Sequence, residues 1–323
     1  MRLGMVGLGR MGANMTTRLI QGGHQVVAYD RDAAAVAKSA DGGAEGAASL
    51  DELLSKLGQP GAGPRVAWVM VPAGAPTDST VNALMEHMTA GDIIIDGGNS
   101  NYQDSIRRAK QCAEKGVRFL DSGTSGGVWG LKEGYALMVG GDADAVETAR
   151  PIFETLAPAP DRGWGHMGPA GSGHFVKMIH NGIEYGLMQA YAEGFSIMHS
   201  KHDFGGEHAD LDLAKIAELW RHGSVVRSWL LDLTAIALQG NPTMHGIAPY
   251  VADSGEGRWT VAEALALDVP APIITGSLIA RLRSRDEEGF TERLLSAMRN
   301  QFGGHAIKYE DAAASAAQTG GQS

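Results

Sequence analysis

The sequence lacks the features of secreted, membrane-spanning and nucleic-acid-binding proteins. Its single cysteine, Cys112, cannot form a disulfide within the chain, which is typical of proteins in a reducing compartment. The chain has no apolar run of membrane-spanning length and no signal peptide before its first glycine-rich loop. A net charge of −10 disfavours nucleic acids and anionic membranes as partners. We therefore expect a cytoplasmic protein that binds a small molecule.

The order of apolar patterns predicts two domains. Up to residue 168, short apolar strands alternate with helices, which is typical of an α/β Rossmann-type dinucleotide-binding domain. From 169 to 307 only helical patterns remain, so we predict an all-α C-terminal domain. Residues 308–323 are rich in Ala, Ser, Gly and Gln, which predicts a disordered tail. We predict no metal site, because the histidines of the second half lack ligand spacing: His199, His202, His208, His222 and His245.

A glycine motif near the start predicts the cofactor site. Gly7-Leu-Gly-Arg-Met-Gly12 follows an apolar strand and precedes a helical stretch, and a second strand ends in Asp30. This is the framing of a dinucleotide-binding GxGxxG loop, whereas a plain packing turn does not account for the acid. A carboxylate there binds ribose hydroxyls and repels a 2′-phosphate, so NAD is favoured over NADP, although Arg31 next to it can also tolerate the phosphate. The predicted cofactor-binding residues are Gly7, Leu8, Gly9, Arg10, Met11, Gly12, Asp30, Arg31, Val71, Pro72, Ala73 and Asn99.

Two polar glycine loops follow later strands. Residues 97–100 come after the strand 92–96, and residues 122–130 after the strand 117–121. Asn99 in the first loop and Ser125 in the second are short hydrogen-bonding side chains among glycines, which suits the binding of a polyhydroxylated acid near backbone N–H groups. Plain turn chemistry is the alternative reading of both loops.

The helical stretch 171–201 carries the strongest catalytic pattern. Four polar residues recur at i, i+3, i+4 and i+7, which places them on one helix face: Lys177, His180, Asn181 and Glu184. Seven helical residues rise about 10 Å, enough to place Lys177 and Glu184 at opposite ends of a small substrate. A second stripe is predicted to pack against the protein: Val176, Ile179, Ile183 and Leu187.

Cations near the end of the chain are candidates for binding an anionic group. Arg281 lies in the helical stretch 271–285, and Arg299 and His305 flank Asn300-Gln-Phe-Gly-Gly304. The paired glycines predict a bend that delivers a side chain elsewhere.

Together these motifs resemble the 6-phosphogluconate dehydrogenase family, decarboxylating enzymes of the pentose phosphate pathway, in its short, single-repeat bacterial form. The likeness runs from Met1 to about Ile307. The glycine loop and the helical lysine are shared with the wider β-hydroxyacid dehydrogenase superfamily. Other motifs are more diagnostic: Asp96-Gly-Gly-Asn-Ser100, Ser125-Gly-Gly127, Lys177-Met-Ile-His-Asn-Gly-Ile-Glu-Tyr185 and Phe302-Gly-Gly-His305.

The resemblance implies a role for each site residue. Lys177, with Asn181 in the catalytic set, takes the proton of the substrate C3 hydroxyl during hydride transfer and then assists loss of CO2. Glu184 protonates C1 of the enediol to give ribulose 5-phosphate. The substrate-binding residues implied are Asn99, Ser125, Gly126, Gly127, His180, Asn181, Tyr185, Arg281, Arg299 and His305. The last two are implied to come from a neighbouring subunit, so the resemblance predicts a homodimer or homotetramer whose second domain binds substrate and forms the oligomer.

The sequence departs from the longer members of this family at one loop. Where they carry Lys-Gly-Thr-Gly-Lys-Trp-Thr, this chain has Ser254-Gly-Glu-Gly-Arg-Trp-Thr260, which places Glu256 where a phosphate contact is expected. Asp30 replaces an asparagine of those members, which again favours NAD.

Two other functions are weighed against this one. A sibling β-hydroxyacid dehydrogenase, such as 3-hydroxyisobutyrate dehydrogenase, keeps the glycine loop and the lysine but leaves Arg281, Arg299 and His305 unexplained. A non-catalytic NAD-binding sensor or assembly protein has no need of Lys177 and Glu184. A related aldonic acid as the true substrate stays open.

Overall fold

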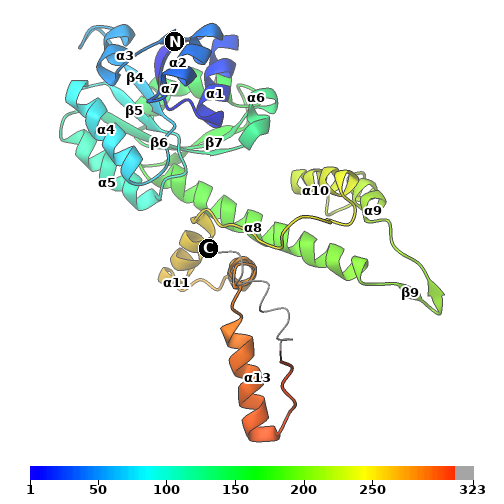
Figure 1. Ribbon diagram of the computed structural model, residues 1–323. Coiled ribbons are helices and arrows are strands. Elements are labelled where there is room, and N and C mark those ends of the chain that lie inside the picture. Colours follow the sequence, from blue (N-terminus) through cyan, green and yellow to red (C-terminus); the bar gives the residue numbers. More distant parts are fainter. Residues whose placement is uncertain (310–323) are drawn as a thin grey trace, which may run out of the picture.

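The computed structural model describes residues 1–309. Its first half forms an eight-stranded sheet in the order β3-β2-β1-β4-β5-β6-β7-β8 (Figure 1). All neighbouring strands run parallel except β6 and β7, which are antiparallel. The strands are β1 Arg2–Val6, β2 Gln25–Tyr29, β3 Glu45–Gly46, β4 Val66–Val69, β5 Ile93–Asp96, β6 Arg118–Ser125, β7 Ala136–Gly140 and β8 Trp164–Gly168. The order reverses between β1 and β4, and ligands of such open sheets bind beyond the carboxyl ends of the strands at this point.

Helices cover both faces of the sheet, as the doubly wound pattern requires. They are α1 Arg10–Gln21, α2 Ala33–Asp41, α3 Leu50–Leu57, α4 Ala75–His87, α5 Tyr102–Ala113, α6 Gly130–Glu133 and α7 Ala143–Leu156. One apolar core lies under α1 and α7 and includes Met15 and Phe153; the other lies under α3, α4 and α5 and includes Leu53 and Cys112. Burial raises the pKa of the Cys112 thiol to about 12, so this cysteine is an unreactive packing residue.

The second half of the chain is helical. Its elements are α8 Ser172–His199, β9 Asp203–Phe204, β10 Glu207–His208, α9 Leu213–Trp220, α10 Trp229–Gly240, α11 Glu256–Ala266, α12 Pro272–Arg283 and α13 Phe290–Gly303. The long helix α8 starts against β6 and β7 and runs out of the first domain (Figure 1). Helices α11 and α12 pack on its middle, and α9 and α10 enclose a small core with Phe195 near its end. The predicted α/β-then-helical fold class is confirmed.

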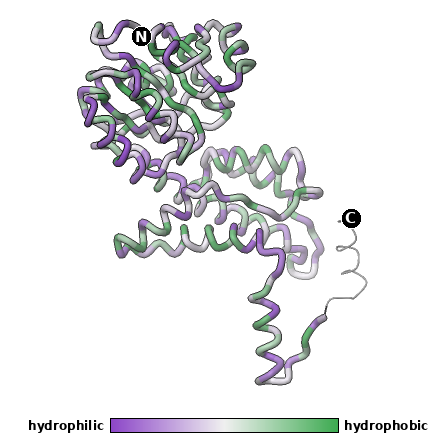
Figure 2. The backbone as a smooth tube through the Cα atoms, turned by 60° about the vertical axis from the view of Figure 1, so that its left-hand side comes forward, coloured by the Kyte–Doolittle hydropathy of each residue, from purple (hydrophilic) through white to green (hydrophobic). Residues whose placement is uncertain are grey.

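Helix α13 differs from the others because it projects away from the rest of the described chain (Figures 1 and 2). None of its side chains whose burial the structure describes is buried, and one side of it exposes Phe290, Leu294 and Met298. No described helix is long and apolar enough to cross a membrane.

The structure corrects four local predictions. Residues 122–125, predicted as loop, continue β6, because they pair with β7 in antiparallel register. The sequence pattern predicts a helix from Thr80 to Thr89, but α4 begins five residues earlier, at Ala75, since Pro76 occupies a first-turn position that needs no N–H donor. The hairpin β9–β10 interrupts the predicted all-helical half. Gly303, predicted to form the bend, is the last residue of α13, and only Gly304 adopts a left-handed conformation, with φ 64°. Residues 310–323 of the predicted tail lie outside the described residues.

Candidate active site

The glycine loop between β1 and α1 has the geometry of a dinucleotide site. Gly7 has φ +96°, and a Cβ there would lie 2.5 Å from the Met70 carbonyl oxygen. A Cβ on Gly12 would overlap the carbonyl of Gly7, so α1 can lie this close to the loop only with glycine there. Gly9, the N-cap of α1, has open space around it and no side-chain cap. These residues fit a pyrophosphate at the N-terminus of α1, where free N–H groups point outward.

Asp30 lies directly beside this loop. Its Oδ2 accepts a hydrogen bond from the Leu8 N–H at 2.6 Å, and its Oδ1 accepts one from the Asp32 N–H at 2.9 Å. The carboxylate therefore fixes the loop and remains half-buried at the end of β2, where a ribose is expected. Arg10 and Arg31 are both exposed. Val71 touches the loop near Gly7, and the predicted contacts Pro72 and Ala73 follow it as exposed residues before α4.

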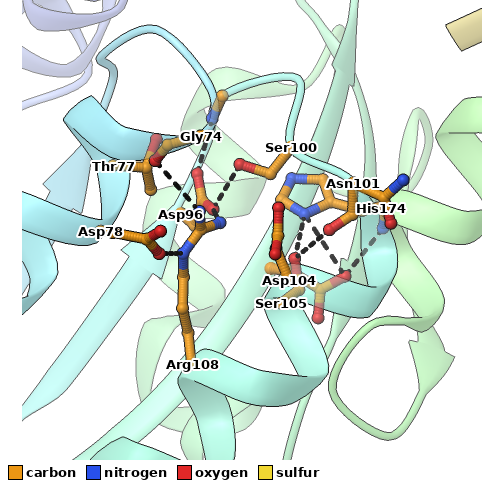
Figure 3. A network of polar contacts seen from close by, with 12 residues as sticks. Gly74, Thr77, Asp78, Asp96, Ser100, Asn101, Asp104, Ser105, Arg108 and His174 are labelled. Carbon is orange, nitrogen blue, oxygen red and sulfur yellow. Dashed lines mark hydrogen bonds and ion pairs between the residues drawn. The ribbon is translucent and has the colours of Figure 1, made fainter.

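A buried ion-pair network positions the loop after β5 (Figure 3). Arg108 is fully buried and contacts Asp96 at 3.1 Å and Asp78 at 2.8 Å. Asp96 Oδ2 also accepts a hydrogen bond from the Ser100 hydroxyl at 2.7 Å, so both ends of the loop that carries Asn99 are fixed. Burial acts to raise the pKa of Asp78, but the hydrogen bonds from the neighbouring guanidiniums outweigh it and hold that pKa below its usual range.

The start of α8 is fixed to the sheet by Asp121, the fourth residue of β6. Its Oδ1 accepts the Gly171 N–H at 2.6 Å, and its Oδ2 accepts the His174 N–H at 2.7 Å. A carboxylate at a helix N-terminus satisfies free donors and complements the helix dipole. The His174 ring in turn contacts the Ser105 hydroxyl through Nδ1 at 2.7 Å (Figure 3). Because Gly123 leaves room for the Lys177 stem, the first two turns of α8 lie directly on β6.

Lys177 is the central residue of the polar face of α8. It is 6% exposed, and its ammonium donates a hydrogen bond to Asn181 Oδ1. Burial lowers the pKa of Lys177, and the charges of Glu184 and Glu256 oppose this only in part. A lysine with a lowered pKa can lose its proton near neutral pH and act as a base.

His180 joins the same network on both sides of its ring. Its Nδ1 lies 3.1 Å from Asn181 Oδ1 and 3.8 Å from Glu184 Oε2, and its Nε2 lies 3.2 Å from the Ser125 hydroxyl. The network assigns the proton to Nδ1, because the amide oxygen can only accept, so the hydroxyl donates to Nε2. The predicted face of α8 and the predicted loop at Ser125 therefore meet through His180.

These groups line one cavity of about 1040 Å³, here named the catalytic cavity. It brings together predicted residues from four parts of the chain: Met11, Asn99, Ser125, Gly126, Gly127, Lys177, His180, Asn181 and Glu184. Ser254 and Glu256 at the start of α11 also line it.

Tyr185 and Arg281 lie beside the catalytic cavity and are not among the residues that line it. The guanidinium of Arg281 lies over the Tyr185 ring, 3.6 Å from the ring centre, and its Nη1 donates to the Ala252 carbonyl at 3.0 Å. The Tyr185 hydroxyl lies 3.3 Å from Ser254 Oγ, which lines the catalytic cavity. A planar cation held by stacking is suited to binding a phosphate.

The apolar stripe predicted to pack inward does not do so. Ile183 is 52% exposed, and Val176 and Leu187 are also exposed; all three line the catalytic cavity. A neighbouring, glycine-bearing face of α8 is the packed one, because helices α11 and α12 approach closely there. A Cβ on Gly182 would lie 2.6 Å from Thr260 Cγ2. The prediction from the large apolar residues is therefore wrong, because the glycines allow α11 and α12 to approach α8 more closely than large side chains do.

Arg299 and His305 do not reach the catalytic cavity of their own chain. Arg299 is exposed on α13, and His305 follows the end of that helix. The catalytic cavity is lined by none of these C-terminal residues.

Sequence reasoning missed three residues that support the site: Arg108, Asp121 and His174. Of these, only Asp121 has a signal in the sequence, because it ends the predicted strand 117–121, and an acid at the carboxyl edge of a buried strand is placed to cap or bind. Glu256, which the resemblance places near a phosphate contact, lines the catalytic cavity.

Both domains of the chain match a known protein family. Residues 2–168 match the family described as the NAD binding domain of 6-phosphogluconate dehydrogenase, and residues 173–292 match the C-terminal domain of the same enzyme. An NAD(+)-dependent, decarboxylating 6-phosphogluconate dehydrogenase of Haloferax volcanii is 45% identical, over 96% of this chain and 100% of the relative. A putative 6-phosphogluconate dehydrogenase of Bacillus subtilis is 44% identical, over 95% and 99%.

Solved structures give the same comparison. The 6-phosphogluconate dehydrogenase of Plasmodium falciparum superposes with a TM-score of 0.78 at 29% identity, covering 97% of this chain and 67% of that one. A 3-hydroxyisobutyrate dehydrogenase of Mycobacterium tuberculosis has a TM-score of 0.69 at 22% identity, covering 88% and 94%. The second likeness concerns the fold alone.

Proposed function

The chain belongs to the 6-phosphogluconate dehydrogenase family, and from this we infer that it oxidises and decarboxylates 6-phosphogluconate to ribulose 5-phosphate and CO2. It reduces a nicotinamide cofactor, NAD or NADP, in doing so. The observation that carries the site assignment is a buried lysine of lowered pKa, Lys177, facing one cavity with Asn99, Ser125 and Glu184.

Proton transfer at Lys177 begins the proposed mechanism. When bound, the cofactor supplies the hydride acceptor for C3 of the substrate. Neutral Lys177 removes the proton of the C3 hydroxyl, so a 3-keto acid forms. The resulting ammonium, held by Asn181, then hydrogen-bonds the new carbonyl oxygen. This stabilises the negative charge that develops when the C1–C2 bond breaks and CO2 leaves.

Glu184 completes the reaction as the proposed acid. It lies two turns beyond Lys177 on the same face of α8, and it gives a proton to the carbon that lost CO2. His180 contacts both Glu184 and Ser125 and so orients the carboxyl group. Asn99, Ser125, Gly126, Gly127, His180 and Asn181 are proposed to hold the carboxylate and hydroxyls of the substrate. Tyr185 and Arg281 are proposed to hold its phosphate.

NAD is the proposed preferred cofactor. Asp30 is half-buried at the end of β2 and bonded to the glycine loop, so its charge cannot move away from a 2′-phosphate. The relative from Haloferax volcanii is named as NAD(+)-dependent, whereas the Plasmodium falciparum enzyme was solved with NADP+.

We also propose a homo-oligomer whose second copy completes the site. Arg299 lies on α13 and His305 follows its end. This helix projects from its own chain and exposes an apolar side that a single copy leaves uncovered. Burial of such a side against another subunit is the usual arrangement in obligate oligomers. The single, buried Cys112 agrees with the proposed cytoplasmic location.

One assay tests the function. The protein is incubated with 6-phosphogluconate and either cofactor while reduced cofactor and CO2 are measured together. We expect equal amounts of both products. Reduced cofactor without CO2 would contradict decarboxylation and favour a sibling β-hydroxyacid dehydrogenase. Cofactor binding without turnover would favour a sensor or assembly protein.

A further inference from the structure

Glu256 places a second carboxylate in the catalytic cavity. It is the first residue of α11 and only 3% exposed, yet it lines the cavity with Lys177 and Glu184. Its Oε2 atom is buried and has no hydrogen-bond partner among residues 1–309. Buried polar atoms are almost always paired in folded proteins, so this one needs an explanation.

The first turn of α11 is fixed along α8. The Thr260 hydroxyl donates to the Met178 carbonyl at 2.9 Å. A Cβ on Gly257 would lie 2.5 Å from Tyr185 Cε2, so the helix start lies directly on that ring. The Glu256 side chain is therefore attached beside the stretch of α8 between Lys177 and Tyr185, and it cannot move out to solvent without separating the two helices.

The missing partner must be a hydrogen-bond donor. The charge of Glu256 opposes the lowering of the Lys177 pKa, so the two side chains attract, but this attraction leaves Oε2 without a hydrogen bond. A carboxylate only accepts hydrogen bonds and repels other anions. In a phosphorylated sugar acid, both ends are anionic acceptors, and the donors are the hydroxyl groups between them.

We propose that Glu256 is a substrate-contacting residue that accepts a hydrogen bond from a hydroxyl between the reacting C3 and the phosphorylated C6, at C4 or C5. This rests on the proposed function, with C3 at Lys177 and the phosphate at Tyr185 and Arg281. Glu256 thus selects sugar acids hydroxylated in this part of the chain. It also keeps the phosphate away from the middle of the catalytic cavity.

Deoxy analogues and substitutions test the contact together. The substitutions are Glu256→Ala, which removes the acceptor, and Glu256→Gln, which keeps an acceptor oxygen without the charge. With 6-phosphogluconate we expect Glu256→Ala to lose roughly 10- to 100-fold in kcat/KM, the effect of losing a hydrogen bond to a charged group. Glu256→Gln should lose less. The matched control is Glu193→Gln, the same change at an exposed position of α8, which should leave kcat/KM unaltered.

The analogues distinguish contact from indirect effects. With the 4-deoxy or the 5-deoxy analogue, whichever lacks the contacted hydroxyl, wild type and Glu256→Ala should have kcat/KM values within about threefold. The 2-deoxy analogue should retain the full difference. An equal loss of kcat/KM in Glu256→Ala with all three analogues would overturn the proposal. So would equal losses of kcat/KM in Glu256→Ala and Glu256→Gln together with a shifted pH profile. In either case Glu256 would act only through Lys177 or the fold.

Failure of the proposed function gives a different result. If wild type does not turn over 6-phosphogluconate, the function is contradicted, and calorimetric binding of the same analogues to wild type and Glu256→Ala decides about Glu256. The contact is supported if Glu256→Ala binds the analogues more weakly than wild type does, except for one deoxy analogue that both proteins bind equally. Equal binding of every analogue by the two proteins overturns it.

Discussion

Lys177 and Asn181 are joined by a hydrogen bond from the ammonium to the amide oxygen, one turn apart on α8. The amide oxygen also lies 3.1 Å from His180 Nδ1, so it accepts from both neighbours. Asn181 therefore fixes the direction of the lysine while leaving its charge uncompensated. Burial without a full countercharge is the physical reason that the Lys177 pKa is lowered.

Substitution of this lysine should separate catalysis from stability. Lys177→Met should abolish turnover and leave NAD binding nearly unchanged, because the side chain acts on the substrate. The same variant should be more stable than wild type at neutral pH. The folded-state pKa is lowered, so the unfolded chain binds more protons between that pKa and the ordinary pKa of lysine. Wild-type stability therefore rises with pH through this window, and the advantage of Lys177→Met should shrink there.

Activity measurements and urea denaturation at several pH values check both parts. The kcat/KM of wild type should rise with pH through a pKa below that of an ordinary lysine, since the neutral amine is the active form. Full activity in Lys177→Met would place the base elsewhere, and lower stability at neutral pH would contradict the burial argument.

Arg281 should matter for the phosphate and little for the cofactor. Arg281→Ala removes the guanidinium held over Tyr185, so we expect KM for 6-phosphogluconate to rise roughly 10- to 100-fold. KM for NAD should stay within about twofold. Arg281→Lys should recover little, because an ammonium cannot reproduce the stacked planar fork. Equal weakening of substrate and cofactor in steady-state kinetics would remove Arg281 from the phosphate site.

Asp30 should set the choice between the two cofactors. Asp30→Asn removes the charge that repels a 2′-phosphate, so the ratio of kcat/KM for NAD to that for NADP should fall about tenfold or more. NAD use should also weaken, because the Leu8 N–H loses a charged acceptor. Asp32→Asn, a neighbouring change at the N-cap of α2, is the control and should leave the ratio unaltered. A constant ratio in Asp30→Asn would mean that another group reads the ribose.

The adjacent arginines of α5 provide a matched test of the network in Figure 3. Arg108→Met leaves Asp96 buried without its cation and should cost about 3–5 kcal/mol of unfolding free energy. Arg107, 44% exposed, pairs with Asp78 and Asp104 at the surface, so Arg107→Met should cost about 1 kcal/mol or less. Similar denaturation midpoints for the two variants would show that burial of the Asp96 pair contributes little.

A shared site predicts complementation between inactive variants. Lys177→Met and Arg299→Ala homo-oligomers should each have little activity. When the two variants assemble at random into dimers, half of the dimers contain one subunit of each variant. Each of these mixed dimers has one intact site, so about a quarter of all sites should be active. The mixture is assayed after co-expression. Activity no higher than the sum of the separate variants would place Arg299 outside a shared site.

Patterns that are local in sequence were the ones from which structure could be predicted. The glycine loop, the strand ending at Asp30 and the polar face of α8 each depend on neighbouring residues. The structure brings Lys177 and Glu184 of that polar face to one cavity. The assigned catalytic and binding roles stay predictions. The continuation of β6 through Ser125 was missed, because a glycine-rich stretch becomes a strand only when β7 pairs with it.

Features that depend on distant residues were beyond sequence reasoning. The bond from Asp121 to the start of α8 joins residues 50 positions apart. The wrong packing stripe has the same origin, since only the approach of α11 shows that the glycine face, with Gly182, is the closely packed one.

The attachment of α8 to Asp121 has a mechanical consequence. The two carboxylate bonds lie before Lys177 along the helix, so the first turns of α8 move as part of the nucleotide-binding domain. Helix α8 continues without a break from this attachment through Lys177 to Tyr185, whose ring lies under the Arg281 guanidinium. One continuous helix therefore sets the spacing between the amine and the stacked guanidinium, and with it the length of sugar acid that can reach both groups.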